Sequence, residues 1–167
     1  NIIFHNEDLE GLKDYLKYLD ALKVDGLIIT DLVVIKYYQE LNLTIPLVLS
    51  TQNSVLNIEA AKFWQKLGIK RIVLGREAKR DDIKEIIAKT GLEIECFIHG
   101  AMCTSLSGMC VLSNYLTNRD SNRGGCAQIC RWAFKCPNKP DFTMTSKDLN
   151  MIDNIFDMES IGISSFK

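Results

Sequence analysis

Short apolar runs alternate with amphipathic segments along the first hundred residues of the chain. The apolar runs cover residues 1–4, 26–29, 46–49, 71–74 and 92–99, and their starts advance by 25, 20, 25 and 21 residues. Each run is typical of a buried strand, and the spacing is that of successive β-α-β units. The pattern therefore predicts a parallel sheet.

Between these runs, apolar residues recur at intervals of three and four, most regularly in residues 9–19 and 56–67. This period is typical of helices that bury one face. Residues suited to caps or to acidic first turns stand at the expected helix starts: Asn6, Asp31, Asn53 and Asp81.

Strands that alternate singly with helices, in a chain without a Gly-x-Gly-x-x-Gly motif, favour a (βα) barrel over a dinucleotide-binding sheet. A complete barrel takes about 250 residues, whereas this chain has 167. We therefore expect an α/β fold, a partial TIM-like barrel. Residues 1–167 would form a single domain that is a fragment of a longer catalytic domain and lacks N- and C-terminal parts of the same chain.

The repeat stops at residues 101–142, which are rich in Cys, Ser, Asn, Gly and Arg and show no periodicity. Residues 146–158 then predict another amphipathic helix, opening at Ser146, and residues 162–166 predict one more strand. The Cys-rich segment is thus an insertion in the loop after the strand that ends at His99. Loops of this length are usually functional or disordered.

The composition is close to neutral, with 20 basic and 21 acidic residues, and 47% of the residues are hydrophobic. No apolar run approaches the ~20 residues that cross a bilayer, and the N-terminus does not resemble a secretory signal. We expect a cytoplasmic protein without a membrane span. Five of the six cysteines lie within residues 103–136, too uneven for a disulfide scaffold, which leaves metal binding, redox chemistry or burial.

The run at residues 92–99 carries a carboxylate and an imidazole. Strand alternation places Glu95 and His99 on one face, toward the barrel axis, and Cys96 on the apolar face toward the helices. Glu95 and His99 are the candidate catalytic residues. A buried Glu95 needs a partner such as Arg71 or Arg76, or a raised pKa; a salt bridge that only shapes the barrel is the alternative. His99 is a candidate general base, metal ligand or hydrogen-bonded turn residue.

Polar residues follow the other strands, where the active sites of barrels collect. Gln52 and Arg76 are the candidate substrate-binding residues there, although capping and turn roles also explain such side chains. In the insertion we add Asn122 and Arg123. Between residues 119 and 139, five cations face one acid, a pattern typical of either a phosphate- or RNA-binding patch or a solvated loop.

The insertion cysteines are separated by six, fifteen, three and five residues, without a Cys-x-x-Cys pair. Several thiolates with almost no nearby histidine favour an iron-sulfur cluster or an all-thiolate zinc site, with burial as the alternative. The candidate metal ligands are Cys103, Cys110, Cys126 and Cys130.

Two motifs resemble the collagenase-like peptidase family, peptidase family U32. The first is Glu95-Cys-Phe-Ile-His-Gly-Ala-Met-Cys-Thr-Ser-Leu-Ser-Gly-Met-Cys-Val-Leu-Ser113, and the second is Asn122-Arg-Gly-Gly-Cys-Ala-Gln-Ile-Cys-Arg-Trp132. Weaker matches at residues 50–52 and 146–149 extend the resemblance over essentially the whole chain.

The resemblance implies a barrel-like catalytic domain, a proteolytic activity of unassigned mechanism and, in other branches, hydroxylation of tRNA, rRNA or quinone rings with a 4Fe-4S cluster. Its cluster ligands would include Cys103, Cys110 and Cys126. Asn150 stands where a fourth cysteine is expected, so Cys130 or Cys136 would have to replace it, or the site holds zinc or no metal.

Three functions follow from these expectations. The first is an iron-sulfur-linked enzyme that hydroxylates RNA bases, with tRNA or rRNA as partner. The second is a peptidase acting on a protein or peptide through a metal or a Cys/His site. The third is a metal-stabilised module without catalytic activity.

Overall fold

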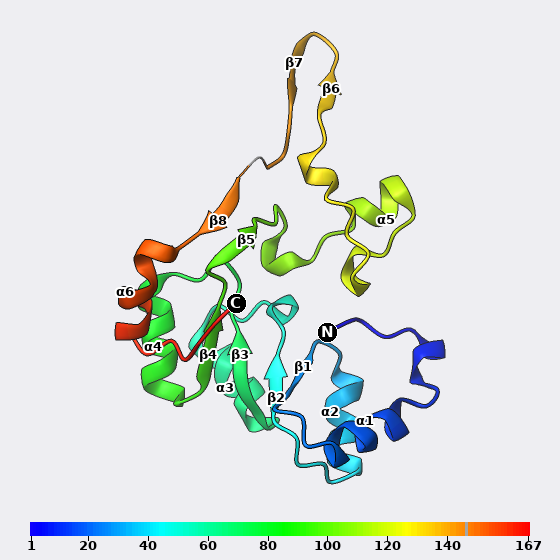
Figure 1. Cartoon of the computed structure of the whole chain (residues 1–167), viewed down its shortest axis with the longest axis vertical. Helices are drawn as coiled ribbons and strands as arrows, with labels where there is room; N and C mark the ends of the chain where they lie inside the picture. The colour runs from blue at the N-terminus through cyan, green and yellow to red at the C-terminus, as the bar shows by residue number, and fades with distance from the viewer. Residues whose placement is uncertain (146) are drawn as a thin grey trace.

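Five parallel strands form the central sheet of the computed structural model, which describes residues 1–145 and 147–167 (Figure 1). In sheet order they are β1 (Leu27–Ile29), β2 (Leu47–Leu49), β3 (Ile69–Val73), β4 (Glu93–Cys96) and β9 (Ser165–Phe166). Every neighbouring pair is parallel. The predicted mixed α/β fold with a parallel sheet is confirmed.

Helices connect these strands as the periodicity predicts. They are α1 (Leu12–Ala21), α2 (Leu32–Glu40), α3 (Ile58–Lys66), α4 (Arg80–Thr90) and α6 (Ile155–Ser160), with the short 3-10 helices η1 (Asn6–Leu9) and η2 (Thr51–Asn53). Asp31 caps α2 by accepting a hydrogen bond from the Val33 N–H at 3.0 Å. Asn57, rather than the expected Asn53, caps α3.

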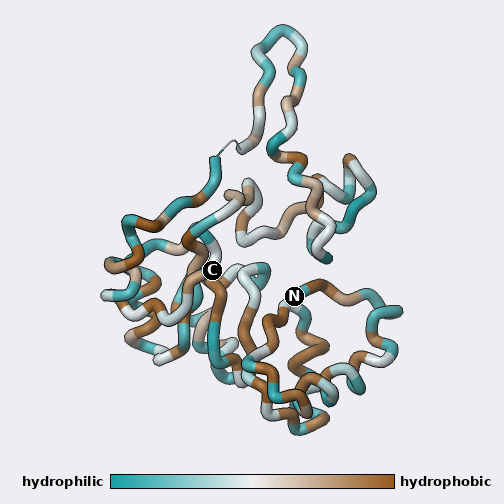
Figure 2. The backbone as a smooth tube through the Cα atoms, in the orientation of Figure 1, coloured by the Kyte–Doolittle hydropathy of each residue, from teal (hydrophilic) through white to brown (hydrophobic). Residues whose placement is uncertain are grey.

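One face of the sheet forms the core. Leu47, Leu49, Ile72 and Ile94 are completely buried there, and Cys96 lies in the same cluster. Figure 2 shows apolar segments concentrated in the sheet and the surrounding helices. Burial of these strand residues, the dominant favourable term in folding, fixes which strand face turns toward the helices.

Three local predictions are wrong. Residues 1–4 form no strand; the Phe4 N–H instead donates to Asp31 Oδ2 at 3.0 Å. The strand expected over residues 92–99 divides into β4 and β5 (His99–Ala101). The helix expected from Ser146 begins only at Ile155, and Ser146 itself lies outside the described residues.

One strand pairing explains both the division of the strand expected over residues 92–99 and the late start of the helix expected from Ser146. Strand β5 pairs antiparallel with β8 (Asp148–Asn150), with His99 opposite Asn150, so residues 148–150 are extended instead of helical. The 3-10 helix η6 (Ile152–Asn154) then leads into α6. This two-stranded ribbon holds the two ends of the insertion together.

The insertion lies beyond the carboxyl ends of the parallel strands (Figure 1). It contains α5 (Leu112–Thr117), the 3-10 helices η3 (Leu106–Gly108), η4 (Ser121–Arg123) and η5 (Ile129–Arg131), and the hairpin of β6 (Phe134–Cys136) and β7 (Lys139–Phe142). The hairpin projects away from the rest of the molecule. None of the helices in residues 1–145 and 147–167 has the length and apolar character that crossing a membrane requires.

A candidate site at the carboxyl edge of the sheet

The insertion is attached to the sheet edge through the loop after β3. Glu77 Oε1 accepts a hydrogen bond from the N–H of Ser107, a buried residue of η3, at 2.8 Å. Gly75 makes this close approach possible, because a Cβ there would lie 2.3 Å from Glu77 Oε2 and 3.0 Å from Ser107 Oγ. Residue types alone do not reveal this contact, since it joins residues 30 positions apart.

Gln52 lies at the same edge, in a group of polar side chains that follow β1 and β2. Thr30 Oγ1 lies 3.0 Å from Gln52 Oε1 and 2.8 Å from Asn1 Oδ1, and the Asn53 side chain donates to the Thr30 carbonyl at 3.2 Å. The structure thus places Gln52 at the carboxyl edge, where the sequence predicts it.

Arg76 lines a cavity of about 290 Å³ between the ends of β3 and β4, helix α4, β8 and α6. Its guanidinium carbon lies 3.8 Å from the centre of the Phe97 ring, a cation–π contact. Its Nη2 donates to the Ala101 carbonyl at 3.3 Å. The cavity combines a positive charge with a largely apolar wall.

A second arginine borders the same cavity. Arg80 makes a two-point ion pair with Asp157 of α6, with Nε–Oδ2 2.7 Å and Nη2–Oδ1 2.6 Å. Cys96 lies on the cavity wall among core residues, and burial, with a smaller effect of Glu95, raises the pKa of its thiol to about 11. Cys96 is therefore a protonated core residue at neutral pH, as the strand parity predicts.

Glu95 lies on the other face of the sheet and is 6% exposed. Its carboxylate pairs with Arg71 (Nη1–Oε2 3.6 Å), one of the two predicted partners, and with Lys167 of the segment after β9 (Nζ–Oε1 3.1 Å). It lines a cavity of about 470 Å³ together with Lys70 and Val48. The sequence does not point to Lys167, because the pair joins residues 72 positions apart.

His99 does not share this environment. The expected alternation is interrupted because β4 ends at Cys96 and β5 begins at His99, where the partner strand is β8. His99 is exposed and lines neither the Arg76 cavity nor the Glu95 cavity. The placement of Glu95 and His99 on one strand face is therefore wrong.

Arg123 connects the insertion to the N-terminal segment. Its guanidinium binds both carboxylate oxygens of Asp8, at 2.5 and 2.8 Å, and donates to the Ile3 carbonyl at 2.7 Å. The neighbouring Asn122 has a buried Oδ1 without a hydrogen-bond partner in the described residues. Arg123 is thus engaged in an ion pair rather than free to bind phosphate.

This ion pair predicts an acid-sensitive contact. The side-chain hydrogen bond from Arg123, with a further backbone hydrogen bond, lowers the pKa of Asp8 to about 2. Because the folded pKa lies below the ordinary value of 3.8, the stabilisation is complete above that value and is lost as the pH falls through about 2. We expect hydrogen-exchange protection of residues 3–8 to decrease over this window. In Arg123→Met this pH dependence should disappear, and its persistence would contradict the assignment.

Besides Asn122 Oδ1, three buried polar side-chain atoms lack a hydrogen-bond partner in the described residues. They are Thr51 Oγ1 at the end of β2, Arg76 Nε at the end of β3 and Ser107 Oγ in η3. Elements η2 and η3 pack against each other, and Ser107 approaches Gly75, so these atoms belong to the same junction of sheet and insertion. Buried polar groups are normally hydrogen-bonded, so a ligand or ordered water at this junction would complete them.

The predicted metal ligands Cys103, Cys110, Cys126 and Cys130 all lie in the insertion. Among the residues that the structure describes, no three His, Cys, Asp or Glu side chains are grouped so that they could hold a metal ion. The described residues therefore do not fit an assembled iron-sulfur or zinc site in this arrangement.

Two of these sulfurs accept backbone hydrogen bonds. The Leu112 N–H donates to Cys110 Sγ and the Gln128 N–H donates to Cys126 Sγ, both at 3.4 Å. The two segments are tied by the hydrogen bond from the Ala127 N–H to the buried Ser113 hydroxyl at 3.0 Å.

The fold and this edge define a class of protein: an α/β domain whose polar, arginine-containing site lies at the carboxyl ends of parallel strands, the usual place for ligands in such sheets. The sequence model of one protein family, peptidase family U32, matches residues 1–167 of the chain. The chain belongs to this family, as its two motifs predict.

Curated relatives of the chain carry several descriptions. It is 43% identical to tRNA hydroxylation protein P1 of Bacillus subtilis over 100% of its length, and 34% identical to the 23S rRNA 5-hydroxycytidine C2501 synthase of Escherichia coli, again over 100%. It is 29% identical to a collagenase of Porphyromonas gingivalis over 100%. The chain spans 43%, 26% and 44% of these relatives. The solved structure of a U32 peptidase can be superposed on 57% of this chain, which is 40% of the length of the solved chain, with 19% sequence identity and a TM-score of 0.47.

Proposed function

We propose that the chain is part of an enzyme that hydroxylates a base of tRNA or rRNA. The observation that carries the proposal is the 43% identity, over the whole chain, to a tRNA hydroxylation protein. The 34% identity to an rRNA hydroxycytidine synthase also supports it. An enzyme with such substrates would work in the cytoplasm.

We also propose that further strands of the full-length protein close the sheet into a TIM-like barrel. The strands β1 and β9 are the outer strands of the described sheet. The sheet face that carries Glu95 and Arg71 would then line the interior of the barrel. A carboxylate paired with two cations is suited to such an interior, because a buried charge requires partners.

In this proposal the base binds at the junction of sheet and insertion. The unpartnered polar atoms of Thr51, Arg76 and Ser107 would hydrogen-bond to it, and Arg76 would supply positive charge. Glu95 is the carboxylate available for proton transfer from inside the barrel, with Arg71 and Lys167 holding its position.

A 4Fe-4S cluster remains a prediction of the cysteine pattern and would require the insertion to rearrange. When bound, such a cluster supplies electron transfer. We expect full-length protein purified without oxygen to contain iron and sulfide, and Cys110→Ser to lower both, with Cys96→Ser as the control in the core. Equal iron in the two variants would contradict the assignment of Cys110.

The activity itself can be tested in bacteria that lack their own hydroxylation proteins. Expression of the full-length protein should yield a tRNA or rRNA nucleoside heavier by one oxygen atom, detected by mass spectrometry of digested RNA. RNA identical to that of the empty host would contradict the proposal. Bound iron without a modified nucleoside would favour the non-catalytic module.

Proteolysis is the second candidate, and the relative described as a collagenase favours it. A site of this kind would use His99 with Cys103 or a metal. Full-length protein should then cleave gelatin, and His99→Ala should abolish the cleavage. Cleavage that survives this substitution would point to a contaminating protease.

A further inference from the structure

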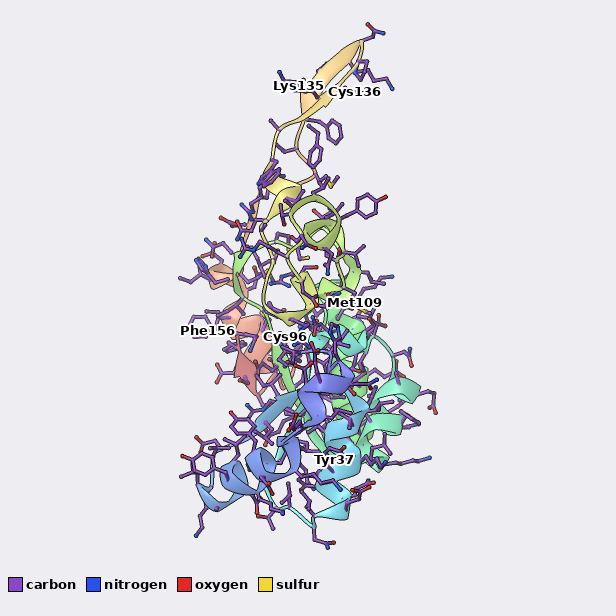
Figure 3. All side chains as sticks on the ribbon, turned by 90° about the vertical axis from the view of Figure 1, so that its right-hand side faces the viewer. Tyr37, Cys96, Met109, Lys135, Cys136 and Phe156 are labelled. Atoms are coloured by element: carbon purple, nitrogen blue, oxygen red, sulfur yellow. The ribbon has the colours of Figure 1, made fainter. Side chains whose placement is uncertain are left out.

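The hairpin of β6 and β7 is a projecting arm whose role the proposed site does not explain. Its strands pair antiparallel, with Phe134 opposite Phe142 and Cys136 opposite Lys139, and Asn138 takes a left-handed conformation in the turn (φ 61°). All four residues of β7 are exposed. Figures 1 and 3 show the hairpin extending away from the sheet, with Lys135 and Cys136 near its outer end.

Two of the five cations of the insertion form ion pairs, and the other three, Arg119, Lys135 and Lys139, form none within the described residues. Arg123 pairs with Asp8, and Arg131 at the base of the hairpin pairs with Asp148. Within residues 1–145 and 147–167, Lys135 and Lys139 have no carboxylate within ion-pair distance. Both lysines are exposed on the arm, which carries a single acid, Asp141.

The apolar surface of the arm is aromatic. The rings of Phe134 and Phe142 stack with centroids 5.6 Å apart and an interplanar angle of 25°, and Phe142 is 50% exposed. Trp132, two residues before the first residue of the hairpin, is 48% exposed. Residues 134–142 contain no Leu, Ile, Val or Met, so aromatic rings form most of the apolar surface of the arm.

We propose that this hairpin is an RNA-binding arm that holds the substrate RNA at a second point, away from the carboxyl edge of the sheet. Lys135 and Lys139 contact phosphates, and the exposed rings of Trp132 and Phe142 stack on unpaired bases, the combination that binds single-stranded RNA. The inference rests on the proposed function for the identity of the RNA. The positive charges of Lys135 and Lys139, which form no ion pair in the described residues, are complementary to the negative charges of the RNA backbone.

If the arm only binds RNA, its removal should weaken the binding of a long RNA without changing the reaction at the carboxyl edge of the sheet. Full-length protein and its Lys135→Ala/Lys139→Ala variant would be titrated by fluorescence anisotropy with an unmodified tRNA transcript over a series of salt concentrations. We expect about tenfold weaker binding and a salt slope reduced by about 1.4, because each lysine–phosphate contact on a single strand contributes about 0.7 to that slope. The rate of hydroxylation of a short RNA fragment that carries the unmodified target nucleotide should stay unchanged.

Lys66→Ala/Lys84→Ala is the matched control, since it removes two exposed lysines from α3 and α4. It should bind tRNA like the unmodified protein. Phe142→Ala should also weaken binding about tenfold through lost stacking. Because this ring also packs on Phe134, the lysine variant, which alters only exposed side chains, decides the matter if Phe142→Ala disturbs the fold.

The outcomes distinguish the arm from the reaction. Weaker tRNA binding by the lysine variant supports the arm even if the full-length protein hydroxylates no RNA. Unchanged affinity and salt slope overturn the arm even if hydroxylation proceeds. Loss of self-association or of a protein partner in the variant, with tRNA binding intact, would likewise overturn it and assign the hairpin to a protein interface.

Discussion

Glu95→Gln in the full-length protein is expected, on the proposed function, to lower the rate of RNA hydroxylation by at least about 100-fold, the usual effect of removing a group that transfers a proton. Glutamine keeps the size of the side chain but cannot exchange a proton in the same way. The buried position of Glu95 makes it the candidate for this role, and Arg71 and Lys167 hold its carboxylate in place. Quantitative nucleoside mass spectrometry of RNA from time courses would measure the rate.

A neighbouring carboxylate supplies the control. Glu93 pairs with the same Arg71 (Nη2–Oε2 2.7 Å), yet its side chain is about half exposed, so Glu93→Gln should leave the rate nearly unchanged. A Glu95→Gln enzyme of normal activity and lowered melting temperature would show that the carboxylate only shapes the sheet. The comparison therefore separates a catalytic role from an internal ion pair.

Ile94→Ala is expected to lower the free energy of unfolding by about 2–5 kcal/mol, the range for large-to-small substitutions at fully buried sites. Ile94 is 0% exposed and lies in β4, which is paired on both sides by β3 and β9. Urea denaturation of the two proteins would give the difference directly.

Ile152→Ala is the matched control for that measurement, because Ile152 is 65% exposed. Its effect should stay within about 0.5 kcal/mol, as for most surface substitutions. Equal losses at positions 94 and 152 would show that the sheet is not the main contributor to stability.

The parts of the fold that the sequence predicts are those that burial alone determines. Apolar runs locate β1 to β4, and strand parity places Cys96 in the core and Glu95 on the opposite face. The errors arise where long-range pairing overrides local pattern. Residues 148–150 carry a helix-like pattern, but their backbone pairs with β5 and is extended.

The candidate site was predictable to a similar degree. The sequence places Gln52 and Arg76 at the carboxyl edge because each follows a strand. It does not reveal that Arg123 pairs with Asp8, since 115 positions separate them. The prediction for His99 is wrong because the chain leaves the central sheet after Cys96. The alternation of side chains along β4 therefore does not extend to His99.

The ribbon of β5 and β8 makes the insertion an exchangeable unit. Three register pairs, from His99–Asn150 to Ala101–Asp148, hold its two ends beside each other. The entropy cost of closing a loop across that clamp rises by only about 0.6 kcal/mol for each doubling of its length. Insertions of different length can therefore be accommodated between these two strands while the sheet keeps its register, so that the segment beyond the carboxyl edge can change without refolding the sheet.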